Sequence, residues 1–270
     1  MLPPLREVIA RHGLAARHSL GQHFLLDGNL TDRIVREAGD LAGRHVIEVG
    51  PGPGGLTRSL LASPAADVTA IELDRRAVAA ISELAESTGG RLRVIEADAL
   101  SVDMTTLTPA PRQVIANLPY NVASPLLVRW LRQAAAFERL TLMFQQEVAE
   151  RICADPGTGA YGRLSVLTQW CCDARIVLRI PPAAFTPPPK VWSAVVALNP
   201  RTTQPDPALF ARMEALTAAA FGQRRKMLRG ALRTLGGEAL LARADIAADR
   251  RAETLTVAEF DRLVQVLQEA

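Results

Sequence analysis

The chain has 270 residues, a hydrophobic content of 49% and a formal net charge of +3. This length allows one large domain, or one domain with an appendage, and the hydrophobic content excludes a disordered chain. No stretch approaches the roughly 18 uninterrupted apolar residues of a membrane span, and the start lacks a basic segment followed by an apolar run. We therefore expect a cytoplasmic protein without a membrane segment.

In chain order, an amphipathic segment at 5–16 precedes an alternation of short β-branched runs and helical stretches from 44 to 198. This alternation predicts an α/β doubly wound domain, with a parallel sheet covered by helices on both faces. The expected strands are His45–Val49, Val68–Glu72, Leu92–Ile95, Val114–Ala116, Leu140–Phe144, Arg175–Leu178 and Ala194–Leu198. A proline-bearing linker at 199–207 and a small domain of three or four helices at 208–270 follow.

The cysteines and histidines form no pattern that suits a metal. Cys153, Cys171 and Cys172 lack a Cys-x-x-Cys spacing, and the four histidines stand in no cluster with cysteines or acids. We therefore expect reduced structural thiols and no metal site.

A glycine-rich turn, Gly50 to Gly55, follows the first expected strand. Glycines let the backbone approach a ligand closely, and the helix that follows offers free N–H groups. However, Pro51 and Pro53 remove N–H donors, and Glu48 would repel an anion. A cationic or zwitterionic ligand therefore fits this turn better than a phosphate group.

Acids end the next two strands. Glu72 lies 22 residues beyond Gly50, near the spacing at which an acid holds a ribose diol, and Asp98 is placed to accept from an adenine amine. Ile71 or Ala99 would flank the adenine ring. Taken singly, each acid is as well explained as a helix N-cap. As an ordered set they predict one crevice at the carboxyl ends of the strands.

The glycine turn and the two acids, in that order, resemble the class I S-adenosylmethionine methyltransferases, whose fold is Rossmann-like with a seven-stranded sheet. NAD is the competing ligand. A dehydrogenase also needs an acid/base system for its substrate, and the sequence shows no convincing one.

The fourth expected strand leads directly into Asn117, Leu118, Pro119 and Tyr120. The N6 amine of adenine is a poor nucleophile because its lone pair is delocalised into the ring, so acceptors for its two hydrogens favour a more tetrahedral nitrogen. The Asn117 side-chain oxygen and the Leu118 carbonyl are the candidate acceptors. Pro119 would hold the turn, and Tyr120 would stack on an unstacked base. The same residues alone are also compatible with an ordinary turn.

Taken together, these motifs resemble the ribosomal RNA adenine N6,N6-dimethyltransferases. The matching segments are 21–25, 48–52, 71–74, 98–99 and 117–121. The resemblance implies that Phe185 sandwiches the target base against Tyr120, and that these residues line the S-adenosylmethionine pocket: His23, Leu25, Gly50, Glu72, Asp98 and Asn117. The family commonly has asparagine where this chain has His23. The resemblance also implies a catalytic domain at 1–200, in which 1–28 form a lid, and an RNA-binding helical domain at 208–270.

Segments 160–166, 185–191 and 223–226 resemble the bacterial branch that dimethylates two adjacent adenines near the 3′ end of 16S rRNA. The expected partner is then the immature 30S subunit, with a role in its biogenesis, and we expect a monomer. Five basic residues, expected on one amphipathic helix, are predicted to contact RNA: Arg224, Arg225, Lys226, Arg229 and Arg233.

Three alternatives stay open. The chain could serve chiefly as a ribosome-assembly factor with secondary catalysis, or it could methylate adenine N6 in 23S rRNA. A DNA adenine methyltransferase is a third possibility, but those enzymes resemble an [Asp/Asn]-Pro-Pro-Tyr pattern, and this chain has Leu118 in place of the first proline.

Overall fold

The computed structural model describes residues 2–14, 23–223 and 226–269. The chain forms two compact units. Unit 1 comprises Met1–Arg129, Ala135–Ala149 and Arg175–Asn199, and unit 2 comprises Trp130–Ala134, Glu150–Ala174 and Pro200–Ala270. Unit 2 therefore includes a middle segment of the chain as well as the C-terminal helices.

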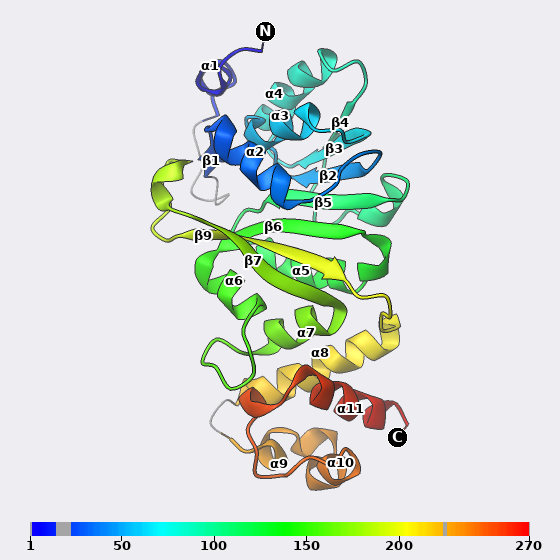
Figure 1. Cartoon of the computed structure of the whole chain (residues 1–270). Helices are drawn as coiled ribbons and strands as arrows, with labels where there is room; N and C mark the ends of the chain where they lie inside the picture. Colours follow the sequence, from blue (N-terminus) through cyan, green and yellow to red (C-terminus); the bar gives the residue numbers. More distant parts are fainter. Residues whose placement is uncertain (1, 15–22, 224–225, 270) are drawn as a thin grey trace. The chain divides into compact units, whose positions relative to one another are not determined.

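A seven-stranded sheet with strand order β4-β3-β2-β5-β6-β9-β7 dominates the fold (Figure 1). Its strands are β2 His45–Val49, β3 Asp67–Glu72, β4 Leu92–Glu96, β5 Arg112–Asn117, β6 Arg139–Gln145, β7 Cys172–Ile180 and β9 Ser193–Pro200. Strands β2 to β6 pair in parallel, whereas β9 runs antiparallel to β6. The predicted doubly wound fold with seven strands is confirmed, but the sheet is mixed and not wholly parallel as expected. The strand ends move by a few residues only.

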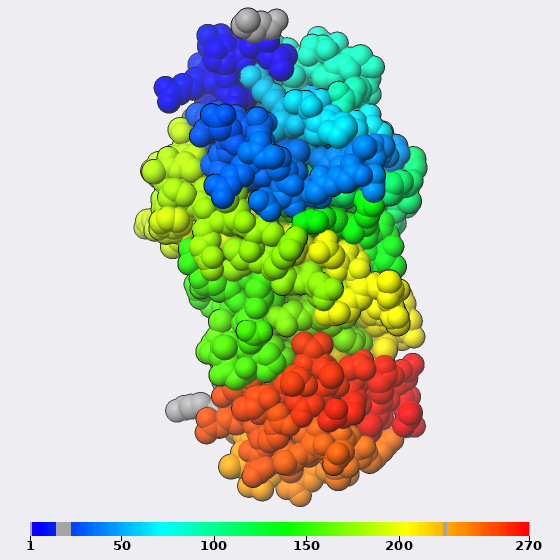
Figure 2. Space-filling model, in the orientation of Figure 1, coloured from blue at the N-terminus to red at the C-terminus, as the bar shows by residue number. Residues whose placement is uncertain are grey.

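The strands β2, β3, β5, β6 and β9 are buried on both faces, which is why they read as nearly continuous apolar runs, whereas the edge strands β4 and β7 expose several residues. On one face, Val46 and Val68 pack with Ile34, Leu60 and Ile81 of the covering helices. These helices are α2 Gly28–Glu37, α3 Gly55–Ala62 and α4 Arg75–Glu86. The blue atoms of α2 cover this face in the space-filling view (Figure 2). The next α-helices in the chain are α5 Ala123–Leu131 and α6 Gln146–Ile152.

The N-terminal part of unit 1 is held by a second, two-stranded sheet. Strand β1 (Phe24–Leu25) pairs antiparallel with β8 (Phe185–Thr186), so segments about 160 residues apart lie side by side. Ahead of it, α1 (Leu5–Arg11) and the ring of Phe24 pack against α4. This pairing fixes the position of the residues next to the glycine turn.

Unit 2 contains a helical core built on aromatic side chains. Its helices are α7 Arg163–Cys171, α8 Pro207–Gly222, α9 Leu228–Ala231, α10 Gly237–Arg243 and α11 Val257–Gln268. Phe221 stacks on Phe260 with ring centroids 5.6 Å apart, and Trp170 stacks on Phe210 at 6.1 Å. The Trp170 indole also donates a hydrogen bond of 2.8 Å to Asp261, which ties α7 to α11.

The single basic helix predicted around 224–233 is wrong. Residues 224 and 225 lie outside the described part of the chain, and over 226–235 the only α-helix is the four-residue α9, followed by a 3₁₀ turn. The backbone N–H of Leu228 donates to the Arg250 carbonyl (2.8 Å) instead of to its own segment. Gly230 further weakens helix formation.

Among the described residues, none of the helices combines the length and apolar character needed to cross a membrane. No group of three or more His, Cys, Asp or Glu side chains within this part of the chain is placed to hold a metal ion. None of Cys153, Cys171 and Cys172 forms a disulfide, and Cys171 and Cys172 are buried.

Candidate active site

A pocket of about 1070 Å³, its open mouth included, lies at the carboxyl edge of the sheet in unit 1. It is walled by the ends of β2, β3 and β5, by the turn after β4 and by β1. Nine of the ten residues predicted for the cofactor and catalytic sites line it, namely His23, Leu25, Gly50, Glu72, Asp98, Asn117, Leu118, Pro119 and Tyr120. The tenth, Phe185, does not.

The glycine turn brings the backbone close to two other segments. Gly50 has φ +69°, a left-handed conformation that favours glycine, and a Cβ there would stand 3.6 Å from the Pro119 ring. At Gly55, an added Cβ would collide with the Leu25 carbonyl oxygen. The turn therefore lies against Pro119, just after β5, on one side and against β1 on the other.

Glu72 presents a fixed carboxylate to the pocket. Its Oε1 accepts from the backbone N–H groups of Leu73 and Asp74, both at 2.8 Å, and its Oε2 accepts from Gly52 N–H at 3.3 Å. Burial raises the pKa of Glu72, and the three backbone donors oppose that shift. The alternative explanation as a helix N-cap fails, because the cap of α4 is Asp74, which accepts from the Arg76 N–H.

Asp98 is an exposed residue in the turn after β4. Its Oδ1 accepts from the Leu100 N–H at 2.9 Å, which orients the side chain. No helix begins there in the described chain, since the following 3₁₀ helix is capped by Asp103. Asp98 therefore lines the pocket without serving as a helix cap.

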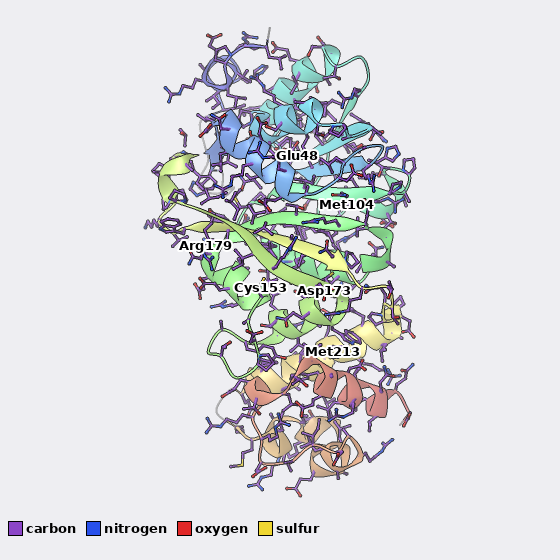
Figure 3. All side chains as sticks on the ribbon, viewed as in Figure 1. Glu48, Met104, Cys153, Asp173, Arg179 and Met213 are labelled. Carbon is purple, nitrogen blue, oxygen red and sulfur yellow. The ribbon has the colours of Figure 1, made fainter. Side chains whose placement is uncertain are left out.

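Glu48 is a pocket residue to which sequence reasoning assigned no binding role. It lies on β2 (labelled in Figure 3) and is only 1% exposed. Its Oε2 has no hydrogen-bond partner within the described residues. Burial raises the pKa of Glu48 to about 8; Thr57 opposes the shift and the nearby Glu72 adds to it. The available signal was a lone acid in an apolar strand. A buried, incompletely bonded carboxyl group is costly unless a ligand supplies a donor or positive charge.

The charged lining of the pocket is entirely acidic. Four carboxyl groups contribute, those of Glu48, Glu72, Asp74 and Asp98, and no lysine or arginine belongs to the lining defined by the described residues. Glu48, with its raised pKa, is mostly protonated at neutral pH, and Asp74 is paired with Arg76, so Glu72 and Asp98 carry most of the negative charge. Such a pocket attracts a cation and repels a pyrophosphate. This electrostatic character favours S-adenosylmethionine over NAD as the ligand.

At the end of β5, a hydrogen bond orients the Asn117 amide. Asn117 Nδ2 donates to the His23 carbonyl oxygen at 3.1 Å, which directs the side-chain oxygen away from β1. The neighbouring Tyr120 is half-buried, and its hydroxyl shares a hydrogen bond of 2.7 Å with the Ser193 hydroxyl. Burial raises the pKa of Tyr120. Both polar side chains of this strand end are thus held by residues from distant segments.

The aromatic arrangement differs from the predicted sandwich of Tyr120 and Phe185. Phe185 is 3% exposed and belongs to the hydrophobic core. The His23 ring contacts both aromatic rings, with centroids 5.5 Å from Tyr120 and 6.4 Å from Phe185. Because a carbonyl oxygen can only accept, His23 Nδ1 donates to the Pro187 oxygen at 2.8 Å. His23 therefore contacts both rings, and of the two aromatic rings only Tyr120 lines the pocket.

Of the basic residues predicted to bind RNA, the three that the structure describes do not line this pocket. Arg224 and Arg225 lie outside the described residues, whereas Lys226, Arg229 and Arg233 are exposed on unit 2.

Comparison with known proteins shows the family of this chain. A family model described as ribosomal RNA adenine dimethylase matches residues 13–269. The ribosomal RNA small subunit methyltransferase A of Gluconobacter oxydans (strain 621H) is 62% identical over 265 residues, covering 98% of this chain and 88% of that protein. The protein of the same name from Rhodospirillum rubrum is 56% identical over 270 residues, covering 100% of this chain and 94% of the relative.

Solved structures show the same architecture. A dimethyladenosine transferase from Plasmodium falciparum has a TM-score of 0.78 at 26% identity, covering 92% of this chain and 98% of its own. The 23S rRNA methyltransferase ErmE has a TM-score of 0.69 at 27% identity, covering 91% and 99%. The fold is that of the class I S-adenosylmethionine methyltransferases. The chain belongs to the ribosomal RNA adenine dimethylase family, whose members use S-adenosylmethionine as methyl donor.

Proposed function

We propose that this chain dimethylates N6 of two adjacent adenines near the 3′ end of 16S rRNA, acting as a cytoplasmic monomer on the immature 30S subunit and without a metal. The observation that carries the proposal is the Asn117 amide, oriented by the His23 carbonyl at the edge of an acidic pocket. The 62% identical relative is named a small-subunit methyltransferase, whereas the 23S enzyme is 27% identical. This difference favours 16S rRNA over 23S rRNA as substrate.

The pocket residues fit S-adenosylmethionine. In the proposed mode Glu72 accepts from the ribose hydroxyls and Asp98 from the adenine amine, while Leu25 and Gly50 form the walls. Glu48, whose buried Oε2 lacks a partner among the described residues, faces the ammonium group of the methionine portion. Bound there, S-adenosylmethionine supplies a methyl group activated by a sulfonium.

At the catalytic strand end, the protein prepares adenine N6 as a nucleophile. The Asn117 side-chain oxygen and the Leu118 carbonyl accept the two N6 hydrogens, which localises the nitrogen lone pair toward the donor. The Tyr120 ring stacks on the base and offsets part of the cost of unstacking it, a cost of a few kcal/mol. The methylated amine is cationic and loses its proton readily, so no strong general base is needed.

We also propose that residues 1–200 form the catalytic domain, with 1–28 as a lid over the cofactor and RNA, and that 208–270 form the RNA-binding domain. The two compact units divide the chain differently, because Trp130–Ala134 and Glu150–Ala174 belong to unit 2. The exposed side chains of Lys226, Arg229 and Arg233 support RNA binding by 208–270. Neutralising phosphates is the expected role of such cations.

The test is incubation of the protein with labelled S-adenosylmethionine and undermethylated 30S particles, followed by mass spectrometry of the RNA. We expect N6,N6-dimethyladenosine at two adjacent positions of 16S rRNA. Asn117→Ala should lower the rate about 100-fold or more, the usual effect of removing a group that stabilises the transition state. Asn29→Ala is the control and should leave the rate unchanged, since Asn29 is an exposed asparagine that is not part of the pocket lining. Absence of dimethyladenosine with the wild type would refute the proposal.

A second candidate function is ribosome assembly with secondary catalysis, favoured by the exposed basic residues that lie outside the pocket. If Asn117→Ala abolishes methylation yet still restores subunit assembly in cells that lack the protein, binding is the main role.

A further inference from the structure

Trp192 differs from the other two tryptophans of the chain. Trp130 is 1% exposed, and Trp170 stacks on Phe210 and donates its indole N–H to Asp261. Trp192 is 48% exposed, and the adjacent Val191 is 44% exposed. Contiguous apolar exposure of this kind marks a contact surface more often than a single exposed side chain does.

The fold places Trp192 at the edge of the sheet where the pocket opens. Because β9 is antiparallel to β6, its first residue, Ser193, pairs with Gln145 at the carboxyl end of β6. The Trp192 carbonyl accepts from the Gln146 N–H at 2.8 Å, so the backbone of Trp192 is fixed to the start of α6. The next residue, Ser193, bonds the Tyr120 hydroxyl at 2.7 Å. Trp192 is therefore the immediate neighbour in the chain of Ser193, the residue that holds the Tyr120 ring.

The segment that carries Trp192 is basic in sequence, and the exposed Glu147 follows Gln146, whose N–H bonds the Trp192 carbonyl. Residues 174–205 contain four cationic side chains and no acidic one. Of these cations, Lys190 is exposed two residues before Trp192. An exposed aromatic ring beside a cation is the combination with which proteins bind single-stranded RNA, through base stacking and phosphate contact.

We propose that Trp192 is a stacking site for the base next to the adenine held at Tyr120, and that Lys190 contacts the RNA phosphate beside it. The proposal rests on the proposed function, in which two adjacent adenines are substrates. Extruding one adenine exposes a face of its neighbour to water, and stacking on the Trp192 indole restores the lost contact. The site thus holds the second adenine while the first is methylated.

The test combines protein variants with an RNA lesion. The probe is a short single-stranded RNA oligonucleotide with two adjacent adenines, compared with one in which either adenine is replaced by an abasic site. Trp192→Ala should weaken binding of the intact oligonucleotide about tenfold, within the range measured for base stacking on aromatic residues. Of the two abasic oligonucleotides, the one that binds the wild type more weakly should lose affinity by a similar factor relative to the intact RNA. Trp192→Ala should lose little further affinity with this oligonucleotide, because the abasic site and the substitution remove the same stacking contact. If the abasic site weakens RNA binding by the same factor in the wild type and in Trp192→Ala, the two changes act independently and the proposal is overturned.

One further variant serves as a control. Trp192→Phe keeps a ring and should retain most of the affinity. The oligonucleotide should also quench the fluorescence of the wild type more than that of Trp192→Phe. This readout applies even if Trp192→Ala fails to fold. Equal quenching in the two proteins would contradict RNA contact at Trp192.

Methylation assays separate this proposal from the proposed function. A wild type that makes no dimethyladenosine refutes the function, whereas a Trp192→Ala protein that binds RNA and methylates 30S particles like the wild type refutes the stacking site alone. If Trp192→Ala is less active on 30S particles but binds the oligonucleotide like the wild type, Trp192 contacts a ribosomal protein instead of RNA. This result would also refute the stacking site. Supporting behaviour is a raised KM for RNA with nearly unchanged kcat.

Discussion

Glu48→Gln should make the protein more stable at neutral pH and a weaker binder of its methyl donor. Glu48 is 1% exposed, and its Oε2 has no hydrogen-bond partner among the described residues. Glutamine has nearly the same shape and carries no charge. The substitution therefore removes the ionisation of this side chain while keeping its packing on β2.

The magnitude follows from the pKa. Burial raises the pKa of Glu48 from 4.5 to about 8. Between these pH values the folded protein keeps a proton that the unfolded chain has lost, so the stability contributed by this group is complete below pH 4.5 and is lost as the pH rises through 8. At about 1.4 kcal/mol per pH unit, the free energy of unfolding of the wild type falls by about 3 kcal/mol between pH 4.5 and 7, relative to the glutamine variant.

The assay is urea unfolding of both proteins without cofactor, at several pH values from 5 to 8.5. The difference between the two proteins isolates Glu48, because the other titrating groups are common to both. Titration calorimetry in buffers of different ionisation enthalpy then counts the protons released on binding of S-adenosylmethionine. The wild type should release up to one proton near pH 7, and the variant should release fewer and bind more weakly. Parallel stability curves over this pH range would refute the reasoning.

Two further substitutions test one contact in each unit, the packing at Gly55 in unit 1 and the ion pair of Glu259 in unit 2. Gly55→Ala drives a methyl group into the Leu25 carbonyl oxygen, so we expect a loss of about 1–3 kcal/mol in stability and weaker cofactor binding by calorimetry; Gly28→Ala, where the added methyl group meets nothing within 4 Å, is the control. Glu259→Gln removes the ion pair with Arg250, the main cause that lowers the pKa of Glu259 to about 2. Because that stability is present above pH 4.5 and lost as the pH falls toward 2, the variant should be about 2 kcal/mol less stable in urea at pH 7, and the gap should close in acid.

The strands and the order of the pocket motifs could be predicted because their signals are local. A strand buried on both faces must be apolar along its whole length, which made His45–Val49 and Leu140–Phe144 visible. Strand ends in an α/β sheet converge by topology, so Gly50, Glu72 and Asp98 could be assigned to one crevice without knowledge of a single contact.

The contacts that orient the site could not be predicted, because they join segments far apart in the chain. Two-residue strands such as β1 and β8 carry no periodic signal, so neither their pairing nor the place of His23 beside Phe185 was visible. The helix predicted around 224–233 failed for a related reason. Charge and apolar spacing favoured a helix, but the Leu228 N–H bonds the Arg250 carbonyl, a tertiary contact that overrides local propensity.

The short strand β1 links the cofactor side of the pocket to the catalytic side. The His23 carbonyl orients the Asn117 amide, and the next residues meet the glycine turn: a Cβ at Gly52 would stand 3.0 Å from the Phe24 ring, and one at Gly55 would collide with the Leu25 carbonyl oxygen. A displacement of β1 therefore changes the pocket wall and the direction of the Asn117 oxygen together. Since misplacement by about 1 Å can cost a hundredfold in rate, this coupling gives a physical reason why residues 23–25, near the start of the chain, belong to the motif that characterises the site.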